Sequence, residues 1–183
     1  RLGYAEADPG FDIDGIDAAH KLSILASLAF GSRLAFGSVA ISGIRQVSPV
    51  DIDYAGVLGY RVKLIGLAKV ENGQLFQRVH PCLVPLSHPL AHVDDALNAV
   101  VAEGNFVGRV LFQGRGAGEG PTASAVVADL IDVARGEWGP PFAMPTSALL
   151  SMAPAPQADH VGRYYIRMAV ADRPGVLADL TAV

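Results

Sequence analysis

An apolar pattern with helical spacing leads from Asp14 to Gly31. Asp14 or Asp17 can cap the predicted helix, and Gly31 can end it because glycine readily takes the left-handed conformation of a helix terminus. Past the first turn, the charged side chains are Lys21 and, when protonated, His20. Apolar residues cover most of the circumference: Leu22, Ile24, Leu25, Ala26, Leu28 and Ala29. A helix that is apolar on nearly all sides is normally buried, and we expect this one to lie inside the protein.

Two opposite charges lie at the start of this helix. Asp17 and Lys21 are four residues apart and therefore share one helical face. A charge removed from water is costly and is kept when it is paired or useful. Glu6 and Asp12, just upstream, are further partners. The alternative is an ordinary salt bridge in a frayed first turn, worth about 0.2–0.5 kcal/mol, and spacing alone favours it slightly over catalysis.

The next stretch predicts a strand and a short helix. Residues 39–47 fit a strand that passes through Gly43. Ser48 followed by Pro49 is typical of a helix start, since serine caps the first free N–H groups and proline has none to lose. The apolar positions that follow stop at Gly59. This helix therefore has a clear beginning and a clear end.

A β-hairpin is predicted for residues 60–83. Residues 60–70 alternate between basic and apolar side chains, residues 75–83 return, and Asn72-Gly73 lies between them. Asn-Gly between two extended runs is the strongest short hairpin signal, because both residues tolerate positive φ. The sequence thus indicates a sheet, although it does not show what covers either face.

A strand at residues 106–113 leads into a glycine-rich run and then into a helix that ends near Arg135. Glycines at the start of a helix could cradle a phosphate, because bare backbone approaches closely and the helix N-terminus favours anions. The spacing is not that of the dinucleotide fingerprint, and such loops more often serve tight turns. Both interpretations stay open on the spacing alone.

Two histidines and two aspartates, His88, His92, Asp94 and Asp95, fall within eight residues and suggest a metal site. Pro89 blocks a regular helix here, so the histidines are not held on one helical face. A loop histidine that caps backbone groups is the commoner outcome. We therefore predict a capped loop and no metal ligands.

Composition narrows the class of protein. The chain has 183 residues, 51% of them hydrophobic, and a net charge of −4 with scattered basic residues, which sets nucleic-acid binding aside. It contains neither a membrane-spanning run nor a secretory signal. The single cysteine, Cys82, cannot form an internal disulfide, so we expect the cytoplasm. A start at Arg1 without methionine and an end within a predicted helix suggest a piece of a longer protein.

One segment resembles a known family closely. Gly3-Tyr4-Ala5-Glu6, Asp8-Pro9, Asp12 and the run from Gly15 to Lys21 resemble the active-site segment of homoserine dehydrogenases. Two further motifs fit the same family in the correct order. These are His88-Pro89-Leu90-Ala91 with Asn98-Ala99-Val100, which in the family position a loop and a small helix, and Gly116-Ala117-Gly118 with Pro121-Thr122-Ala123-Ser124-Ala125-Val126 and Asp129.

The resemblance implies a hydride transfer that interconverts L-homoserine and L-aspartate 4-semialdehyde with NAD or NADP, a step toward threonine, methionine and isoleucine. It makes Lys21 the acid/base, because an alcohol gives up hydride only as its proton leaves. Glu6 and Asp17 would hold the substrate ammonium group, and Asp12 would support Lys21 or a bridging water. The implied cofactor contacts are Gly3, Glu6, Gly116 and Gly118.

The resemblance also implies an architecture. We expect an α+β fold with a mixed sheet and helices on one face, in a catalytic and substrate-binding region at residues 1–136. Of these, residues 114–136 would return toward a nucleotide-binding domain. Residues 137–158 are then a tail and linker. Residues 159–183, where 163–171 alternate as a strand before a helix, resemble the start of an ACT regulatory domain.

Partners follow from the same resemblance. A homodimer is expected, with threonine as a possible effector of the full-length protein and a monovalent metal possible there. The nicotinamide cofactor would be bound mainly by an N-terminal half that these residues lack. This chain alone is therefore expected to be inactive.

Two other functions are open. One is a different oxidoreductase of aldehyde or semialdehyde substrates. Such enzymes that use phosphate or thioester chemistry generally need a cysteine nucleophile, and Cys82 beside Pro81 has no expected partner to activate it. An amino-acid-sensing binding module would use the ACT piece, but it would leave Glu6, Asp17 and Lys21 without a role.

Overall fold

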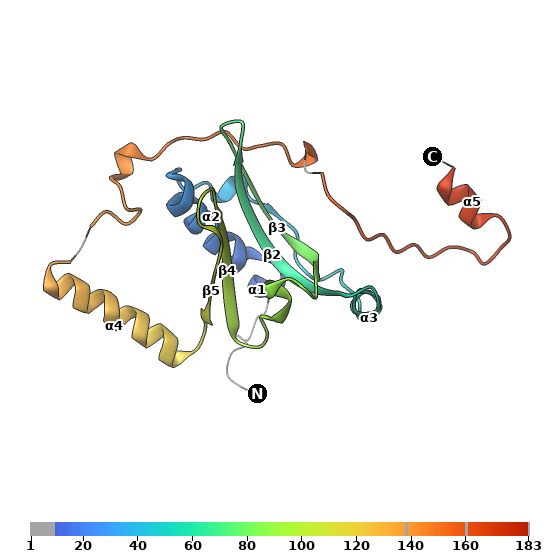
Figure 1. Cartoon of the computed structure of the whole chain (residues 1–183), viewed down its shortest axis with the longest axis horizontal. Coiled ribbons are helices and arrows are strands. Elements are labelled where there is room, and N and C mark those ends of the chain that lie inside the picture. Colours follow the sequence, from blue (N-terminus) through green and yellow to red (C-terminus); the bar gives the residue numbers. More distant parts are fainter. Residues whose placement is uncertain (1–9, 138, 160, 183) are drawn as a thin grey trace.

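The computed structural model describes residues 10–137, 139–159 and 161–182. Two of the predicted site residues, Gly3 and Glu6, lie outside the described residues. The described elements comprise a three-stranded sheet, a separate two-stranded sheet, and helices that precede, connect and follow them (Figure 1).

Helices α1 (Gly10–Ile13) and α2 (Ile16–Phe30) meet at Gly15. Gly15 is the N-cap of α2 with φ +79°, and no side chain caps this terminus. The prediction that Asp14 or Asp17 caps the helix is therefore wrong, because a tight left-handed corner joins the two helices and Asp14 binds elsewhere. The predicted end is confirmed, since Gly31 is the C-cap with φ +61°.

Only one face of α2 is buried. This face consists of small residues and one leucine: Ala19, Leu22, Ser23, Ala26 and Ser27. Ile24, Leu25 and Leu28 are 47%, 39% and 46% exposed, so the expectation of a helix buried on all sides is wrong for the described residues. Small residues bring α2 close to the sheet, where a Cβ on Gly66 would lie only 3.3 Å from Leu22 Cδ1.

The three-stranded sheet is mixed, with strand order β1-β3-β2. Strand β1 (Ala40–Ile41) runs parallel to β3 (Gln74–Pro85), and β2 (Tyr60–Glu71) is antiparallel to β3. The predicted hairpin is confirmed: Glu71 pairs with Gln74, and both turn residues have positive φ, +51° and +75°. The short η1 (Phe36–Ser38) precedes β1.

The main core lies between α2 and this sheet. It is formed by Ala19, Leu22, Val39 and Val79, with Ala18, Leu64 and Ala68 packed against it. Helix α3 (Pro49–Val57) packs on β2. The result is the expected α+β fold with a mixed sheet.

Helix α3 begins as the sequence predicts. Ser48 Oγ accepts the Asp51 N–H, and the Asp51 carboxylate accepts the Ser48 N–H, a reciprocal capping box. The strand predicted over residues 39–47 forms only at Ala40–Ile41. Beyond it, the Ile44 N–H donates to the Ile13 carbonyl instead of to a strand, so the chain turns away from the sheet.

The second sheet is an antiparallel pair, β4 (Leu97–Gly104) and β5 (Gly108–Arg115), which follows η2 (Pro89–His92). Strand β5 matches the predicted strand closely. Strand β4 was not predicted, because the resemblance suggested a loop and a small helix there. Its pairing with β5 from Leu97↔Arg115 to Gly104↔Gly108 sets its conformation.

Helix α4 (Glu119–Arg135) follows β5 and extends away from both sheets (Figure 1). It forms where the glycine-rich run predicted a helix, and it ends at Gly136 with φ +76°. Its apolar side chains are largely exposed, including Val126, Val127, Leu130, Ile131 and Val133.

The C-terminal part first runs along the body of the molecule. Leu150 bridges Ser32 and Pro154 bridges Leu75, and the 3-10 turns η3 (Thr146–Ala148) and η4 (Gln157–Asp159) lie in this stretch. Residues 161–174 then run toward α5 (Val176–Thr181), which lies on the opposite side of the β2–β3 hairpin from α4 (Figure 1). The strand predicted at 163–171 is not formed, because no strand among the described residues pairs with it.

Candidate functional site

Asp17 and Lys21 form the ion pair that their spacing predicts. Lys21 Nζ donates to Asp17 Oδ2 at 2.5 Å on the first turns of α2. The side chains are 58% and 37% exposed, so both reach solvent. The exposed Ile24, Leu25 and Leu28 continue along α2 beyond them. A cation, a carboxylate and an apolar surface thus lie together on an accessible face, where a carboxylate can bind a cationic group and an ammonium can exchange a proton.

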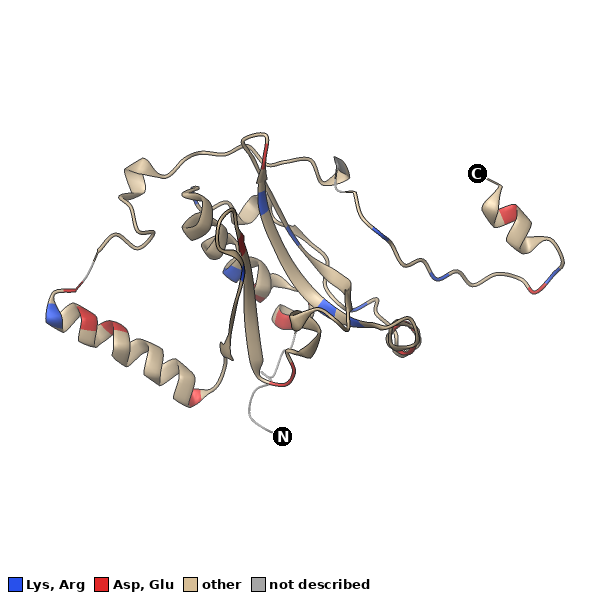
Figure 2. Cartoon of the chain, in the orientation of Figure 1, with Lys and Arg blue, Asp and Glu red and all other residues tan. Residues whose placement is uncertain are grey.

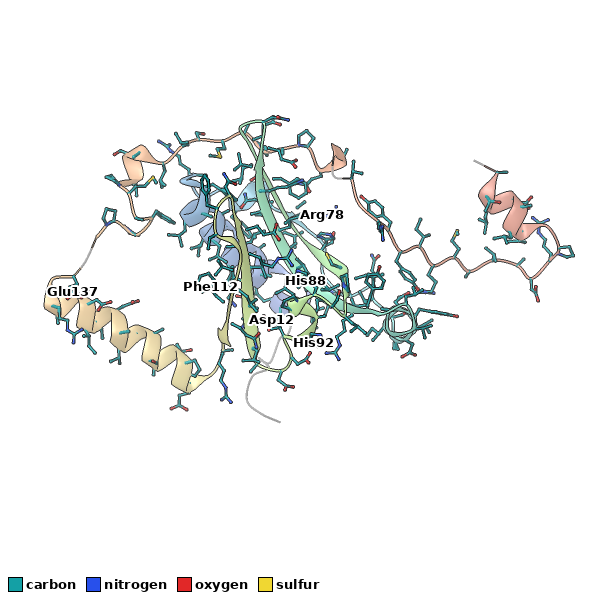
Figure 3. All side chains as sticks on the ribbon, in the orientation of Figure 1. Asp12, Arg78, His88, His92, Phe112 and Glu137 are labelled. Atoms are coloured by element: carbon teal, nitrogen blue, oxygen red, sulfur yellow. The ribbon has the colours of Figure 1, made fainter. Side chains whose placement is uncertain are left out.

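The corner before α2 fixes where this pair lies. A Cβ on Gly15 would lie 3.1 Å from Val79 Cγ1 and 3.4 Å from Ile41 Cγ2, so the corner is pressed directly onto the sheet. Asp12 is exposed in α1, and its carbonyl accepts the Gly15 N–H at 3.1 Å (Figure 3 labels Asp12). Asp12 therefore shares the rigid corner from which α2 presents Asp17 and Lys21.

An ion pair between Arg45 and Asp14, which the sequence did not indicate, fastens the loop before α3 to the corner between α1 and α2. Arg45 binds the Asp14 carboxylate through both Nε and Nη2, the latter at 2.9 Å. The hydrogen bond from Arg45 lowers the pKa of Asp14. Gly43 comes so close to Ile13 and Asp14 that a Cβ would overlap their backbone. The partners are 31 residues apart, and no local signal indicates such a contact.

His20 lies in an aromatic stack that was also missed. Its ring lies 4.0 Å from Phe36 at an interplanar angle of 3° and 5.9 Å from Phe11 at 16°. The stack joins α1, α2 and η1 beside Lys21. From the sequence, His20 was only a possible charge on α2, whereas its aromatic neighbours come from other elements.

Gly116 and Gly118, the predicted cofactor glycines, lie between β5 and α4. Gly118 is the N-cap of α4 with φ +110°, and no side chain caps the helix. A Cβ on Gly116 would overlap the Asn98 side chain. Bare backbone and an uncapped helix N-terminus fit part of a nucleotide, although Asn98 by itself accounts for the need for glycine at 116. Gly116 and Gly118 lie in the connection between β5 and α4, whereas Asp17 and Lys21 lie on α2.

The loop around His88 is capped, as predicted. His88 Nδ1 accepts the Leu90 N–H at 3.2 Å, and His92 Nε2 lies 2.7 Å from the Leu86 carbonyl (Figure 3). Asp94 binds Arg61 and Lys63, and both interactions lower its pKa, the Lys63 hydrogen bond most. In the part of the chain that the structure describes, no cluster of three or more His, Cys, Asp or Glu could hold a metal ion.

The charges of the described residues are scattered, as the sequence indicated. Lys and Arg are scattered among the elements, and Asp and Glu are interspersed with them (Figure 2). No helix among the described residues combines the length and apolar character needed to cross a membrane.

Comparison with known proteins decides the family. The family model described as homoserine dehydrogenase matches residues 1–131. The chain belongs to the homoserine dehydrogenase family.

The homoserine dehydrogenases that this chain matches are longer than the chain itself. The chain is 45% identical over 188 residues to homoserine dehydrogenase of Pseudomonas aeruginosa, covering 100% of the chain and 43% of that relative. A crystal structure of a homoserine dehydrogenase from Thiobacillus denitrificans has a TM-score of 0.84 at 45% identity, covering 100% of this chain and 43% of that one. A hyperthermophilic archaeal homoserine dehydrogenase mutant in complex with NADPH has a TM-score of 0.55 at 32% identity, covering 72% and 36%. The chain thus spans less than half the length of these relatives.

The alternative of a semialdehyde oxidoreductase with a cysteine nucleophile depends on the reactivity of Cys82. His80 Nε2 lies 3.3 Å from Cys82 Sγ, a neighbour that the sequence did not indicate. Burial nevertheless raises the pKa of Cys82, and Arg78 opposes the effect only in part. A half-buried thiol with a raised pKa is a poor nucleophile at neutral pH, so the structure does not favour a cysteine-dependent semialdehyde enzyme.

Proposed function

We propose that this chain is the substrate-binding and catalytic region of an enzyme that interconverts L-homoserine and L-aspartate 4-semialdehyde with a nicotinamide cofactor. The observation that supports the proposal most directly is the Lys21–Asp17 pair at 2.5 Å, presented by a helix whose start is fixed at Gly15. Family membership supplies the reaction class. The enzyme is the full-length protein.

Each proposed role follows from the chemistry at a stated atom. Lys21 Nζ would exchange the proton of the substrate hydroxyl, because hydride can leave carbon only as that proton departs. Asp17, together with Glu6, would bind the substrate ammonium group through charge-assisted hydrogen bonds. Asp12, on the same corner, would orient Lys21 or a bridging water. The exposed apolar side chains of α2 would help to exclude water from the reacting atoms.

The cofactor would be NAD or NADP, which supplies the hydride acceptor when bound. Support comes from a relative whose structure was solved with NADPH. Gly116 and Gly118 would offer bare backbone near it, with Gly3 and Glu6 as further contacts. Most cofactor contacts would come from a nucleotide-binding region outside these residues, so this chain alone should neither bind the cofactor nor oxidise homoserine.

The domain boundaries and the binding partners of the protein are proposed from its family membership. The regions would be residues 1–136 for catalysis, with 114–136 reaching back to the nucleotide-binding region, then 137–158 as a linker and 159–183 as the start of an ACT domain. A homodimer in the cytoplasm is proposed. A monovalent metal would belong to the part outside this chain.

Threonine is proposed as an effector that binds near residues 172–175. Gly175, with φ +92°, begins α5, and a Cβ there would meet nothing within 4 Å. Gly175→Val in the full-length protein should abolish threonine binding in calorimetry and threonine inhibition together. Inhibition that survives deletion from Asp159 onward would exclude this site.

The decisive experiment compares two lysines in the full-length enzyme. Lys21→Ala should lower kcat by about 10²–10⁴-fold, the usual contribution of an acid/base group. Lys69→Ala is the matched control, because Lys69 forms a similar ion pair with Glu71 at 2.6 Å on the hairpin, and it should keep kcat within about twofold of the wild-type value.

The change in kcat separates the two interpretations of Lys21, and the thermal midpoint shows whether each variant is still folded. An exposed ion pair contributes little, about 0–1 kcal/mol, so Lys21→Ala should not shift the thermal midpoint appreciably. Asp17→Asn and Glu6→Gln should raise the KM for homoserine and lower kcat. A two- to threefold loss in Lys21→Ala, or unchanged KM in both carboxylate variants, would contradict the proposal.

A further inference from the structure

The first turn of α3 holds the C-terminal segment through one carboxylate. Arg167 Nε donates to Asp51 Oδ1 at 2.6 Å, and Tyr165 Oη donates to the same oxygen at 3.1 Å. Arg167 Nη2 also lies 3.4 Å from Ser48 Oγ. More than 110 residues separate the two sides of this contact. It therefore joins the region of the predicted ACT piece to the region of the candidate site.

The capping box of α3 orients the Asp51 carboxylate for this contact. Its Oδ2 already accepts the Ser48 N–H at 2.9 Å and the Ser48 hydroxyl at 2.6 Å, within the capping box of α3. The side chain is 14% exposed. Its pKa is held well below the ordinary range, chiefly by the Arg167 hydrogen bond and then by those of Ser48. The carboxylate is thus charged, oriented and nearly saturated with donors.

The segment itself has two chemically different sides. Tyr165 and Arg167, two positions apart, meet α3, whereas the residues between and around them are apolar and exposed: Tyr164, Ile166, Met168 and Val170. In an extended chain alternate side chains point to opposite faces. The contact with Asp51 therefore fixes which face of the segment is turned away from the catalytic region.

The same turn of α3 is connected to the candidate site by a short, tied-down loop. Ser48 follows Arg45 by three residues, and Arg45 binds Asp14 at the corner before α2. The Ile44 N–H donates to the Ile13 carbonyl at 2.9 Å, and Val47 N–H donates back to Ile44. Gly43 leaves no space between this loop and the corner. A displacement of the start of α3 would therefore be passed to the corner that carries Asp12, Asp17 and Lys21.

We propose that the start of α3 is the docking surface for the C-terminal segment, with Asp51 held by Tyr165 and Arg167, and that this docking positions the α1–α2 corner through the loop at residues 42–48. Arg167 and Asp51 are positioning residues here, since neither touches the Asp17–Lys21 pair. The kinetic part of the proposal rests on the proposed function, and the structural part does not.

The test uses the full-length enzyme with Arg167→Met and a matched control, Arg163→Met. Arg163 lies on the same segment and is exposed. Loss of a charge-assisted contact should raise the rate of thermolysin cleavage within residues 161–170 by about fivefold in Arg167→Met. Amide exchange of Ile44 and Gly15 should rise as well. Coupling of this size should change kcat/KM for homoserine by about fivefold or more, and Arg163→Met should change none of the three.

Asp51→Asn and the double variant complete the design. If Asp51 and Arg167 act through each other, the double variant should be no worse than the more damaged single variant, because the second change removes nothing further. A helix start weakened by Asp51→Asn does not spoil the test, since Arg167→Met leaves the capping box intact.

Three results would overturn the proposal. One is additive loss in the double variant, another is an equal effect of Arg163→Met, and the third is loosening of the C-terminal segment while Ile44, Gly15 and kinetics stay unchanged. If the wild-type enzyme does not oxidise homoserine, the proposed function fails, and cleavage and exchange still decide the docking.

Discussion

Replacing Gly15 by alanine would test the corner on which the candidate site is built. The substitution adds one methyl group at φ +79°, a conformation that costs an L residue about 1–2 kcal/mol. The methyl group would also lie 3.1 Å from Val79 Cγ1 and 3.4 Å from Ile41 Cγ2, and overpacking a filled core costs about 1–3 kcal/mol. We expect Gly15→Ala to lower the free energy of unfolding by about 2–5 kcal/mol.

Gly59→Ala separates the cost of backbone strain from the cost of overpacking. Gly59 has nearly the same φ, +80°, but a Cβ there would meet nothing within 4 Å. It should therefore cost only the backbone strain of about 1–2 kcal/mol. The extra 1–3 kcal/mol in Gly15→Ala corresponds to a thermal midpoint about 2–12 °C lower than that of Gly59→Ala for a domain of this size.

Calorimetry on the full-length enzyme measures both midpoints, and steady-state kinetics measures the site. Gly15→Ala should also lower kcat by about tenfold or more, because small misplacements of reacting groups are costly, while Gly59→Ala should retain the wild-type rate. Equal midpoints and equal rates in the two variants would refute the idea that the close contact of Gly15 with the sheet positions the site.

Three further outcomes follow from the structure. Phe76→Ala should cost about 3–5 kcal/mol because this ring is only 2% exposed, whereas Phe106→Ala, at a fully exposed tip, should be nearly neutral by the same calorimetry; similar midpoints would contradict this packing. Asp94→Asn should speed amide exchange in the loop at residues 88–95 at pH 7, and the difference from wild type should vanish in acid. A carboxylate whose pKa is lowered by folding stabilises the folded state above its ordinary pKa of 3.8, and this stabilisation is lost as the pH falls through the folded pKa. A difference that persists in strong acid would argue against the ion pairs. Cys82 should react with iodoacetamide more slowly than an exposed cysteine at pH 7.5, and its rate should still be rising above pH 9, since burial raises its pKa; rapid labelling at pH 7.5 would show an accessible thiolate.

Elements with adjacent signals could be predicted from the sequence. Ser48 begins α3, Asn72-Gly73 turns the hairpin and Gly31 ends α2, because each signal acts on the backbone within a few residues. The Asp17–Lys21 pair belongs to the same class, since its members meet across one helical turn. In each of these features the interacting residues are close in the sequence and are therefore close in space.

Features that depend on distant partners could not be predicted. Asp14 looked like a helix cap but binds Arg45, which the fold brings from 31 residues away. His20 stacks on rings from two other elements. Residues 44–47 had strand-like patterning, yet the Ile44 N–H donates to the Ile13 carbonyl and not to a neighbouring strand. In each case a tertiary contact overrode a reasonable local preference.

The turn between β2 and β3 has a practical consequence. Asn72 and Gly73 are both exposed, and a side chain at 73 would meet nothing within 4 Å, whereas Glu71 and Gln74 directly below are paired across the hairpin. Exposed tips of this kind tolerate inserted sequence well. A short peptide that binds a fluorescent dye, inserted between Asn72 and Gly73, would attach an optical reporter to the central sheet without replacing any residue of the hairpin.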